Sequence, residues 1–525
     1  RRSCHALREV PMLQSFSIRS RIFAGSVALC LPLAGFAQSS SSGSGQTPQA
    51  QQLPLSGRPQ GGASVSAPQT ASGSSSSSVN TVNTTIQVQG SYQGSIVGAV
   101  PGDGPIPLTF PEALQRGLQY NLGSFDSAAS VKQVRAQRLS ALSQLLPNIY
   151  ATLSETGAKT DLQTLGLSSA TFGGNIALPV TVGPYHYYSA QANVSEQLSL
   201  TGLQNLRSAE SLSKAALLSA RDARELIILA VGGSYLRVLA TQALVASQEA
   251  QVRYSEASYN QAKAQFEAGT KAEIDASRSL VELQTQQQRL SSQKAQLLKD
   301  RMSLSRLVGL PLDRPLLLSE TLPANVSEMP IAEQALKEGQ EHRADLQAAG
   351  LQLKAAQQSL RASHAQYLPS LSVNGSYGVE GVNPNKGANV FQASATLNVP
   401  IWSSGRTRSQ VQQAEATVSQ RTAELEDEKG AVENDIRTAI LDLQVSAQQL
   451  KVADSNRQLA LSTLKQSQDR YTAGVATSVE VVQSQESLAS AELDYVNSLF
   501  SLNVGRIKYA RAIGLAEQTV PDLLK

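Results

Sequence analysis

The chain has 525 residues, of which 41% are hydrophobic, 16% charged and 5% aromatic. The charged share is well below the ~25% of ordinary soluble domains, and so few aromatic residues argue against a compact aromatic-rich core. The formal net charge is +3, but residues 1–37 contain five arginines and one glutamate. The other 39 basic and 40 acidic residues therefore give −1. A nucleic-acid partner requires a basic surface, so we expect no nucleic-acid binding.

Residues 1–37 have the layout of a secretory signal peptide. A basic start precedes a short apolar stretch at Ile22–Ala34, and small residues mark a cleavage point after Ala37. An N-terminal membrane anchor is the alternative, but an uninterrupted span needs ~20 apolar residues. The two cysteines, Cys4 and Cys30, fall inside this segment. The secreted chain is therefore expected to have no thiol, which excludes disulfides and cysteine-ligated metals.

Residues 38–107 are predicted to be a low-complexity, poorly ordered region. Residues 38–82 are mostly Ser, Gln, Gly and Pro, and such a composition buries too little apolar area to offset the entropy of ordering. Residues 83–107 are rich in glycine and contain short β-prone pieces that the sequence alone does not assign.

An internal repeat organises the rest of the chain. The stretch Asn121–Ile149 has the same length and pattern as Arg343–Leu371, with Pro147 matching Pro369 as the residues that open the strands. Each copy continues with a strand pair, a long helix, a turn and another helix, and repeats of this kind mark one duplicated unit. The expected boundaries are 108–310 for the first repeat, 311–328 for a linker, 329–515 for the second repeat and 516–525 for a C-terminal tail.

Two very long helices are predicted, at residues 202–266 and 405–471. At ~1.5 Å per residue, each would extend about 100 Å. Gly269 and Gly474 follow them, and glycine at this place usually ends a helix in the left-handed conformation. The segment Phe266–Asp275 then matches Tyr471–Glu480 in the second copy.

The predicted strands alternate between apolar residues and small polar residues. Phe391 and Leu397, for example, lie in one row, and Gln392 and Asn398 in the other. A row of small polar residues cannot build a dry core but can line water, and strands of ~10 residues with this alternation are typical of transmembrane β-barrels. A half-exposed soluble sheet is the alternative.

Four strands cannot close a membrane barrel, and lipid does not tolerate an open edge. We therefore expect the strands to be pooled between subunits. A dimer would give eight strands and a filled interior, whereas the favoured trimer would give twelve strands and a lumen. Tyr188 and Trp402 are candidates for the aromatic girdles of such a barrel, with packing in loops or at a rim as the alternative.

With the repeat, the Leu-Pro strand starts and the paired Ala-Gly turns in view, the sequence resembles the TolC family of outer-membrane efflux ducts over about residues 108–515. The resemblance implies a mainly α-helical homotrimer with a 12-stranded transmembrane β-barrel, four strands per chain, in the outer membrane. A long α-helical coiled-coil barrel would continue from it into the periplasm. The implied partners are a periplasmic adaptor, an inner-membrane transporter and outer-membrane lipid.

By the same resemblance, the two turns form a periplasmic tip where the tunnel narrows. Asp275 and Glu480 match the acidic tip positions of the family, and Tyr471 matches a tyrosine that takes part in latching. The chain differs at Ala476, where a latch arginine can occur, and at Gln483, where a second aspartate can follow. The expected constriction residues are Asp275, Glu480, Tyr471, Gln483, Lys271 and Arg278.

The resemblance also implies that the adaptor docks on the turns, at Gly269, Thr270, Ala272, Gly474, Val475 and Ala476. Helix capping is a competing interpretation of the acidic residues, because Thr270 and Glu273, and likewise Thr477 and Glu480, have the spacing of a capping box. Both interpretations stay open for Glu480.

No catalytic site is predicted. His186, His342 and His364 have no partner at metal-ligand spacing, and the sequence contains neither a nucleophile elbow nor a phosphate-binding loop. We therefore expect a non-enzymatic duct for efflux or type I secretion, without cofactor or metal. A secreted periplasmic coiled-coil adaptor or scaffold is the alternative, which explains the helices and the signal but not two matched strand pairs.

Overall fold

The computed structural model describes residues 65–66, 87–88, 91–99, 104–166, 179–325 and 329–524, which all belong to the unit Arg58–Lys525. The signal peptide expected at residues 1–37 and most of the region 38–107 lie outside these described residues.

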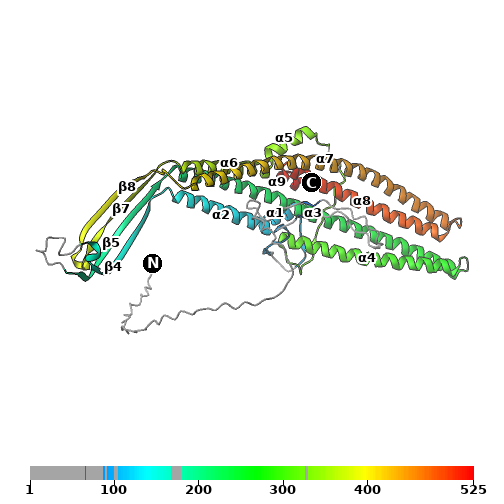
Figure 1. The fold of residues 1–525 in the computed structure, drawn as a ribbon. Helices are drawn as coiled ribbons and strands as arrows, with labels where there is room; N and C mark the ends of the chain where they lie inside the picture. The colour runs from blue at the N-terminus through cyan, green and yellow to red at the C-terminus, as the bar shows by residue number, and fades with distance from the viewer. Residues whose placement is uncertain are drawn as a thin grey trace, which may run out of the picture. The chain divides into compact units, whose positions relative to one another are not determined.

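The expected order of elements occurs twice (Figure 1). In both copies a short additional helix precedes the predicted first helix. The first copy contains α1 (Phe110–Tyr120), α2 (Leu122–Ser143), β4 (Asn148–Asp161), β5 (Thr181–Leu198), α3 (Leu200–Glu267) and α4 (Glu273–Val308). The second contains α5 (Ala332–His342), α6 (Ala344–Ala365), β7 (Ser370–Gly381), β8 (Ala388–Asn398), α7 (Arg406–Thr472) and α8 (Ser478–Ala512).

The shorter elements connect and flank these two copies. They are β1 (Val65–Ser66), β2 (Gln87–Val88), η1 (Ser91–Gln93), β3 (Ile106–Pro107), η2 (Gln163–Leu165), β6 (Leu316–Leu317), η3 (Pro384–Lys386), α9 (Ala516–Thr519) and η4 (Val520–Asp522). Strand β3 pairs in parallel with β6, which ties the start of the first repeat to the segment between the repeats.

Local side-chain contacts set where several helices begin. The Oδ1 of Asn121 accepts a hydrogen bond from the backbone N–H of Gly123 at 2.9 Å, which caps α2. Ser199 does the same for α3, since its Oγ accepts from the N–H of Gly202 at 3.1 Å. Such caps satisfy backbone donors that have no partner within the helix. The long helix α3 therefore starts two residues earlier than predicted.

Strands β4, β5, β7 and β8 form one antiparallel sheet in that order. Pro147 and Pro369 lie immediately before β4 and β7, and proline is tolerated where a strand starts because no ladder hydrogen bond is needed from it there. The register joins the two copies in the middle of the sheet, where Ala192 of β5 faces Tyr377 of β7. Among the described strands, β4 and β8 each have one edge without a partner.

The main apolar core lies where α1, α3, α4 and α8 meet. Phe110, Tyr235, Leu304 and Phe500 are almost completely buried there, and the rings of Phe110 and Tyr235 pack with centroids 5.2 Å apart. Among the described helices, α3 alone is long and apolar enough to cross a membrane by length and composition, but 72% of its apolar window is buried inside the structure. This window therefore packs as a core segment.

The end of the region 38–107 packs against the first repeat. The backbone N–H of Ile96 donates to the carbonyl of Tyr120, and that of Gly98 donates to the carbonyl of Gly309, both at 2.9 Å. Asn121 donates from its Nδ2 to the carbonyl of Tyr92 at 2.8 Å. Residues 91–99 thus form a strap across α2 and the end of α4.

Candidate functional site at the helix turns

The two turns between the long helices have the same backbone construction. Gly269 and Gly474 adopt φ values of 71° and 78°. In the first turn the N–H of Thr270 donates to the carbonyl of Gln265 at 2.9 Å, and in the second the N–H of Val475 donates to the carbonyl of Arg470 at 3.0 Å. These bonds satisfy carbonyl groups at the ends of α3 and α7, as in a Schellman motif.

A direct hydrogen bond joins the two turns. The Oγ of Ser478, the first residue of α8, donates to Oδ1 of Asp275 in the first turn of α4 at 2.8 Å. The two residues are 203 positions apart in the sequence. Asp275 therefore bonds the other repeat rather than only its own helix.

Tyr471 makes a second connection between the turns. Its hydroxyl donates to Oε1 of Gln265 at 3.2 Å, and the Nζ of Lys271 lies 5.3 Å from the centre of its ring. Burial, and then the nearby Asp275 carboxylate, raise the pKa of Tyr471. Both effects keep the hydroxyl protonated, so that it remains a hydrogen-bond donor.

Glu480 has a partner within its own repeat. Its Oε1 lies 3.5 Å from Nε of Arg470, whose side chain is 59% exposed, and the Glu480 side chain is 38% exposed. Exposed ion pairs of this kind contribute about 0–1 kcal/mol. The pair fixes the Glu480 side chain beside the end of α7 without joining the two turns.

The capping-box interpretation of the acidic residues is wrong in both turns. The residue that caps α4 is Ala272, not Thr270, and the hydroxyl of Thr270 donates to the carbonyl of Gln265 at 2.8 Å. Thr477 does occupy the cap position of α8, but its side chain makes no capping hydrogen bond. Because Gly269 is left-handed, the chain turns so that the Thr270 hydroxyl bonds the last turn of α3. Thr270 therefore cannot cap α4.

The other expected site residues are distributed over different environments. Ala476 is buried in a small apolar cluster with Tyr471, whereas Val475 beside it is exposed. Gln483 and Arg278 are exposed, and within the described part of the chain neither makes a hydrogen bond or ion pair. The turns therefore present Val475 to solvent but not Ala476.

The two candidate girdle residues lie toward opposite ends of the strands. Tyr188 pairs with Gly381 at the end of β7 that leads into the β7–β8 connection. Trp402 is 86% exposed and lies between the end of β8 and the start of α7, on the helical side of the sheet.

Sequence reasoning missed three partners in the turns: Ser478, Gln265 and Arg470. Each is defined by a contact across a turn or between the repeats, and no residue pattern near them signals that contact. Gln265 and Arg470 each lie four residues before their turn glycine, and this shared position in the repeat was the available clue for those two.

Comparison with known proteins shows the family. The family described as outer membrane efflux protein matches residues 126–310 and 335–514, together more than half of the chain. The chain belongs to the outer membrane efflux protein family. It is an outer-membrane efflux channel whose helical part lies in the periplasm. The alternative of a secreted periplasmic adaptor or scaffold is not favoured.

Two curated relatives illustrate the similarity of this efflux protein at the sequence level. It is 28% identical over 385 residues to the pyoverdine export outer membrane protein OpmQ of Pseudomonas putida, covering 70% of the chain and 77% of the relative. It is 24% identical over 422 residues to the probable efflux pump outer membrane protein SepC of Pseudomonas putida, covering 77% and 82%.

Solved structures show that the fold is shared. The outer-membrane channel OprN superposes with a TM-score of 0.68 at 18% identity, covering 77% of this chain and 89% of that one. The outer membrane protein VceC from Vibrio cholerae gives 0.66 at 19% identity, covering 77% and 96%. The prediction of a mainly helical, TolC-like outer-membrane protein is confirmed at this level.

Proposed function

We propose that the chain is the passive outer-membrane duct of a tripartite efflux or type I secretion system, and that its periplasmic end is held closed by contacts between the two turns. The observation that carries the closed end is the hydrogen bond between Ser478 and Asp275, which ties the first repeat to the second. Because the inner-membrane pump would select what is exported, the duct needs no catalytic site, cofactor or metal.

The sheet supports a homotrimer with twelve barrel strands. Each chain supplies four strands, with unpaired edges at β4 and β8 among the described strands, and lipid requires every backbone hydrogen-bonding group to be paired. Pairing β8 of one copy with β4 of the next satisfies both edges. Tyr377, Phe391 and Leu397 are exposed on the single chain, in keeping with an apolar surface that faces outer-membrane lipid.

The helices provide an independent argument for the same assembly. On α7, Val445, Val452 and Leu459 are exposed at seven-residue spacing, and on α4, Ile274, Val281 and Met302 are exposed at multiples of seven. Heptad-spaced apolar residues without a partner form coiled-coil seams. Different exposed apolar positions on α7 and α4 favour a head-to-tail contact between copies, and such contacts form a ring when the rotation between copies closes.

The turns would serve as the adaptor-docking end of this ring. The exposed backbone around Gly269, Thr270 and Ala272, and around Gly474 and Val475, is where a periplasmic adaptor would bind, and an inner-membrane transporter would act through that adaptor. Asp275 and Glu480 from three copies would place carboxylates at the constriction and favour cations, with Tyr471, Lys271, Arg278 and Gln483 around them.

The domain boundaries proposed for this duct follow the repeat. A signal peptide at 1–37 and a low-complexity region at 38–107, in which residues 91–99 form the strap, would precede the repeats 108–310 and 329–515. Residues 311–328 would link the repeats, and 516–525 would form the tail.

Single-channel conductance in planar bilayers tests the closed end. We expect Ser478→Ala to raise the open probability of the purified full chain, because the bond to Asp275 is lost. We expect Asp275→Ala with Glu480→Ala to reduce the preference for cations. Glu273→Ala, an exposed change in the same turn, is the control and should behave as the unchanged chain does. Conductance that is unchanged by Ser478→Ala and by Asp275→Ala with Glu480→Ala would contradict a constriction at the turns, as would a Glu273→Ala control that changes it equally.

Cell fractionation tests the duct itself. The protein should be recovered with outer membranes, and recovery in the soluble periplasmic fraction would support the adaptor or scaffold instead.

A further inference from the structure

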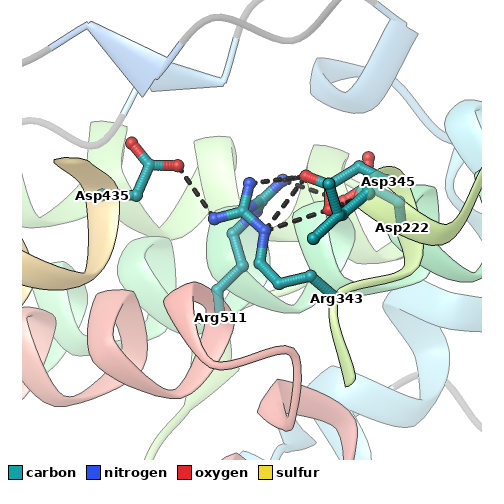
Figure 2. Close-up of polar contacts among 6 residues, drawn as sticks. Asp222, Arg343, Asp345, Asp435 and Arg511 are labelled. Carbon is teal, nitrogen blue, oxygen red and sulfur yellow. Dashed lines mark hydrogen bonds and ion pairs between the residues drawn. The ribbon is translucent and has the colours of Figure 1, made fainter. Parts of the chain in front are cut away.

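Away from the turns, a network of charged side chains, centred on the buried Arg343, joins helices of both repeats. Asp222 lies on α3, Arg343 and Asp345 lie at the start of α6, Asp435 lies on α7 and Arg511 lies near the end of α8 (Figure 2). No other cluster of this size is recorded among the described side chains, and the proposed duct function does not use it.

Two arginines hold this network together. Arg343, only 4% exposed, donates to Asp345 at 3.0 Å and to Asp435 at 2.9 Å. Arg511 donates to Asp222 at 2.8 Å and lies 3.9 Å from Asp345. Burial alone would lower the pKa of Arg343, but its hydrogen bonds to the two carboxylates raise it, so it stays charged. Burial alone would raise the pKa of Asp345, but its bonds to Arg343 lower it, so it stays ionised.

Glu225 lies one helical turn from Asp222 on the same helix and has a different environment. Its side chain is 3% exposed, and among the described residues it makes no hydrogen bond or ion pair. Arg343 is engaged by two other carboxylates, and Arg511 bonds Asp222 through Nη2, while its buried Nε has no hydrogen-bond partner among the described residues. An ionised carboxylate buried without a partner is strongly unfavourable.

The charged groups around Glu225 do not resolve this conflict. Burial raises the pKa of Glu225 to about 7; Arg511 opposes this, Asp222 adds to it, and the weaker effects of Arg221 and Asp345 oppose each other. Burial also raises the pKa of Asp222, and of Glu428 on the facing α7. The remaining titratable or charged groups of the network, from the other packed elements, are Arg343, Asp435, Tyr92 of η1 and Asp126 of α2.

We propose that Glu225 is a proton-operated switch that controls how tightly α3 is held against α6 and α8. With its proton bound, the side chain is neutral and packs among the helices. When the proton leaves to solvent, the carboxylate attracts Arg511, whose Nε is unpaired in the described part of the chain, and the guanidinium that now bonds Asp222 and lies beside Asp345 turns toward Glu225. The junction of the two repeats is thus firm in mild acid and loosened above neutral pH.

The direction follows from linkage. Between the ordinary value of 4.5 and about 7, the folded chain keeps a proton on Glu225 that the unfolded chain releases. Stability therefore falls as the pH rises through this window and changes no further above it.

The test uses the full chain purified in detergent and compares Glu225→Gln with Glu256→Gln, an exposed glutamate on the same helix. Difference infrared spectroscopy follows the carbonyl band of protonated carboxyl groups, and hydrogen exchange follows the amides of α3 and α8. In the unchanged chain and in Glu256→Gln, we expect a carboxyl band that disappears near neutral pH. We also expect exchange rates, corrected for the intrinsic base-catalysed rise with pH, to become roughly tenfold faster over the same range. Glu225→Gln should lack both changes.

Asp222→Asn supplies a second, opposite arm. It removes the competing anion from Arg511, which can then pair with the Glu225 carboxylate. Both transitions should move to lower pH. A neutral-range carboxyl band in Glu225→Gln would overturn the proposal, as would a pH dependence of its exchange that remains after correction for the intrinsic rate. Transitions that stay in place or move upward in Asp222→Asn would also overturn it. Titration of the band without any change in exchange would also overturn it, because Glu225 would then not control the packing.

Discussion

The same helix, α3, passes through two regions with opposite packing. From Leu226 to Val245 its inward positions are almost all large apolar side chains in the main core. Nearer the turn, its buried positions become Gln248, Gln251 and Ser255. We call this second region, which also contains Gln286, Gln293 and Gln485 of α4 and α8, the glutamine seam.

The seam is less completely satisfied than the core. The amide of Gln248 bonds Oε1 of Gln286 at 2.6 Å, but neither side-chain polar atom of the buried Gln485 has a partner among the described residues. A cavity of ≈ 10 Å³, lined in part by Gln248, Gln251 and Gln293, lies within it, which is about the space that one water needs. The apolar core thus fixes the helices where α1, α3, α4 and α8 meet. In the glutamine seam, nearer the turns, we expect the same helices to rearrange with a smaller loss of packing free energy.

The largest expected effect is in the core. Phe110→Ala removes a completely buried ring that packs on Tyr235 and should lower the free energy of unfolding by about 3–5 kcal/mol, measured by thermal or denaturant unfolding. Phe125→Ala, an exposed phenylalanine on α2, is the control and should cost far less. Equal losses would mean that the core is not the anchor described above.

The seam should respond to apolar substitution in two opposite ways. Gln485→Leu removes unpaired buried polar atoms and should stabilise the chain by about 1–2 kcal/mol. Gln248→Leu leaves the amide of Gln286 without this partner and should destabilise it by about 1–3 kcal/mol. Both are measured by the unfolding midpoint. If both substitutions destabilise equally, the seam is as tightly specified as the core.

The smallest effects are expected from glycines of α7 and the turn that follows it. Gly474→Ala forces a side chain into a φ of 78° and should cost about 1 kcal/mol, although the added methyl group has open space. Gly430→Ala, within α7 and also with open space, should instead stabilise the helix by about 0.5–1 kcal/mol. If both substitutions move the unfolding midpoint in the same direction, then the space around the added methyl group, and not the backbone conformation, determines the effect on stability.

Elements defined by local patterns could be predicted closely from the sequence. The long helices were expected at residues 202–266 and 405–471 and are found at 200–267 and 406–472. Pro147 and Pro369 marked strands that begin one residue later. Hydrophobic periodicity, proline and glycine act on the backbone of their own segment. The boundaries of these helices and strands can therefore be predicted from the local sequence alone.

Contacts between distant segments could not be predicted in the same way. The bond from Ser478 to Asp275 and the isolation of Glu225 both depend on which helices lie side by side. The capping-box spacing at Thr270 was misleading for a local reason, because the left-handed Gly269 turns that residue toward Gln265, five positions earlier. The strap at residues 91–99 is likewise held by backbone hydrogen bonds and by rings packed against glycines. Contacts of this kind cannot be predicted from the composition of the segment.

The open edges of β4 and β8 also bear on how the protein is made. A lone copy would carry two rows of unpaired peptide groups into any bilayer, and hydrocarbon offers them no partner. On the proposed trimer, insertion and association are therefore a single event whose rate depends on the concentration of copies. A copy that folds before its partners are available would remain in the periplasm. The unpaired edges of β4 and β8 would then be open to pairing with exposed strands of other proteins.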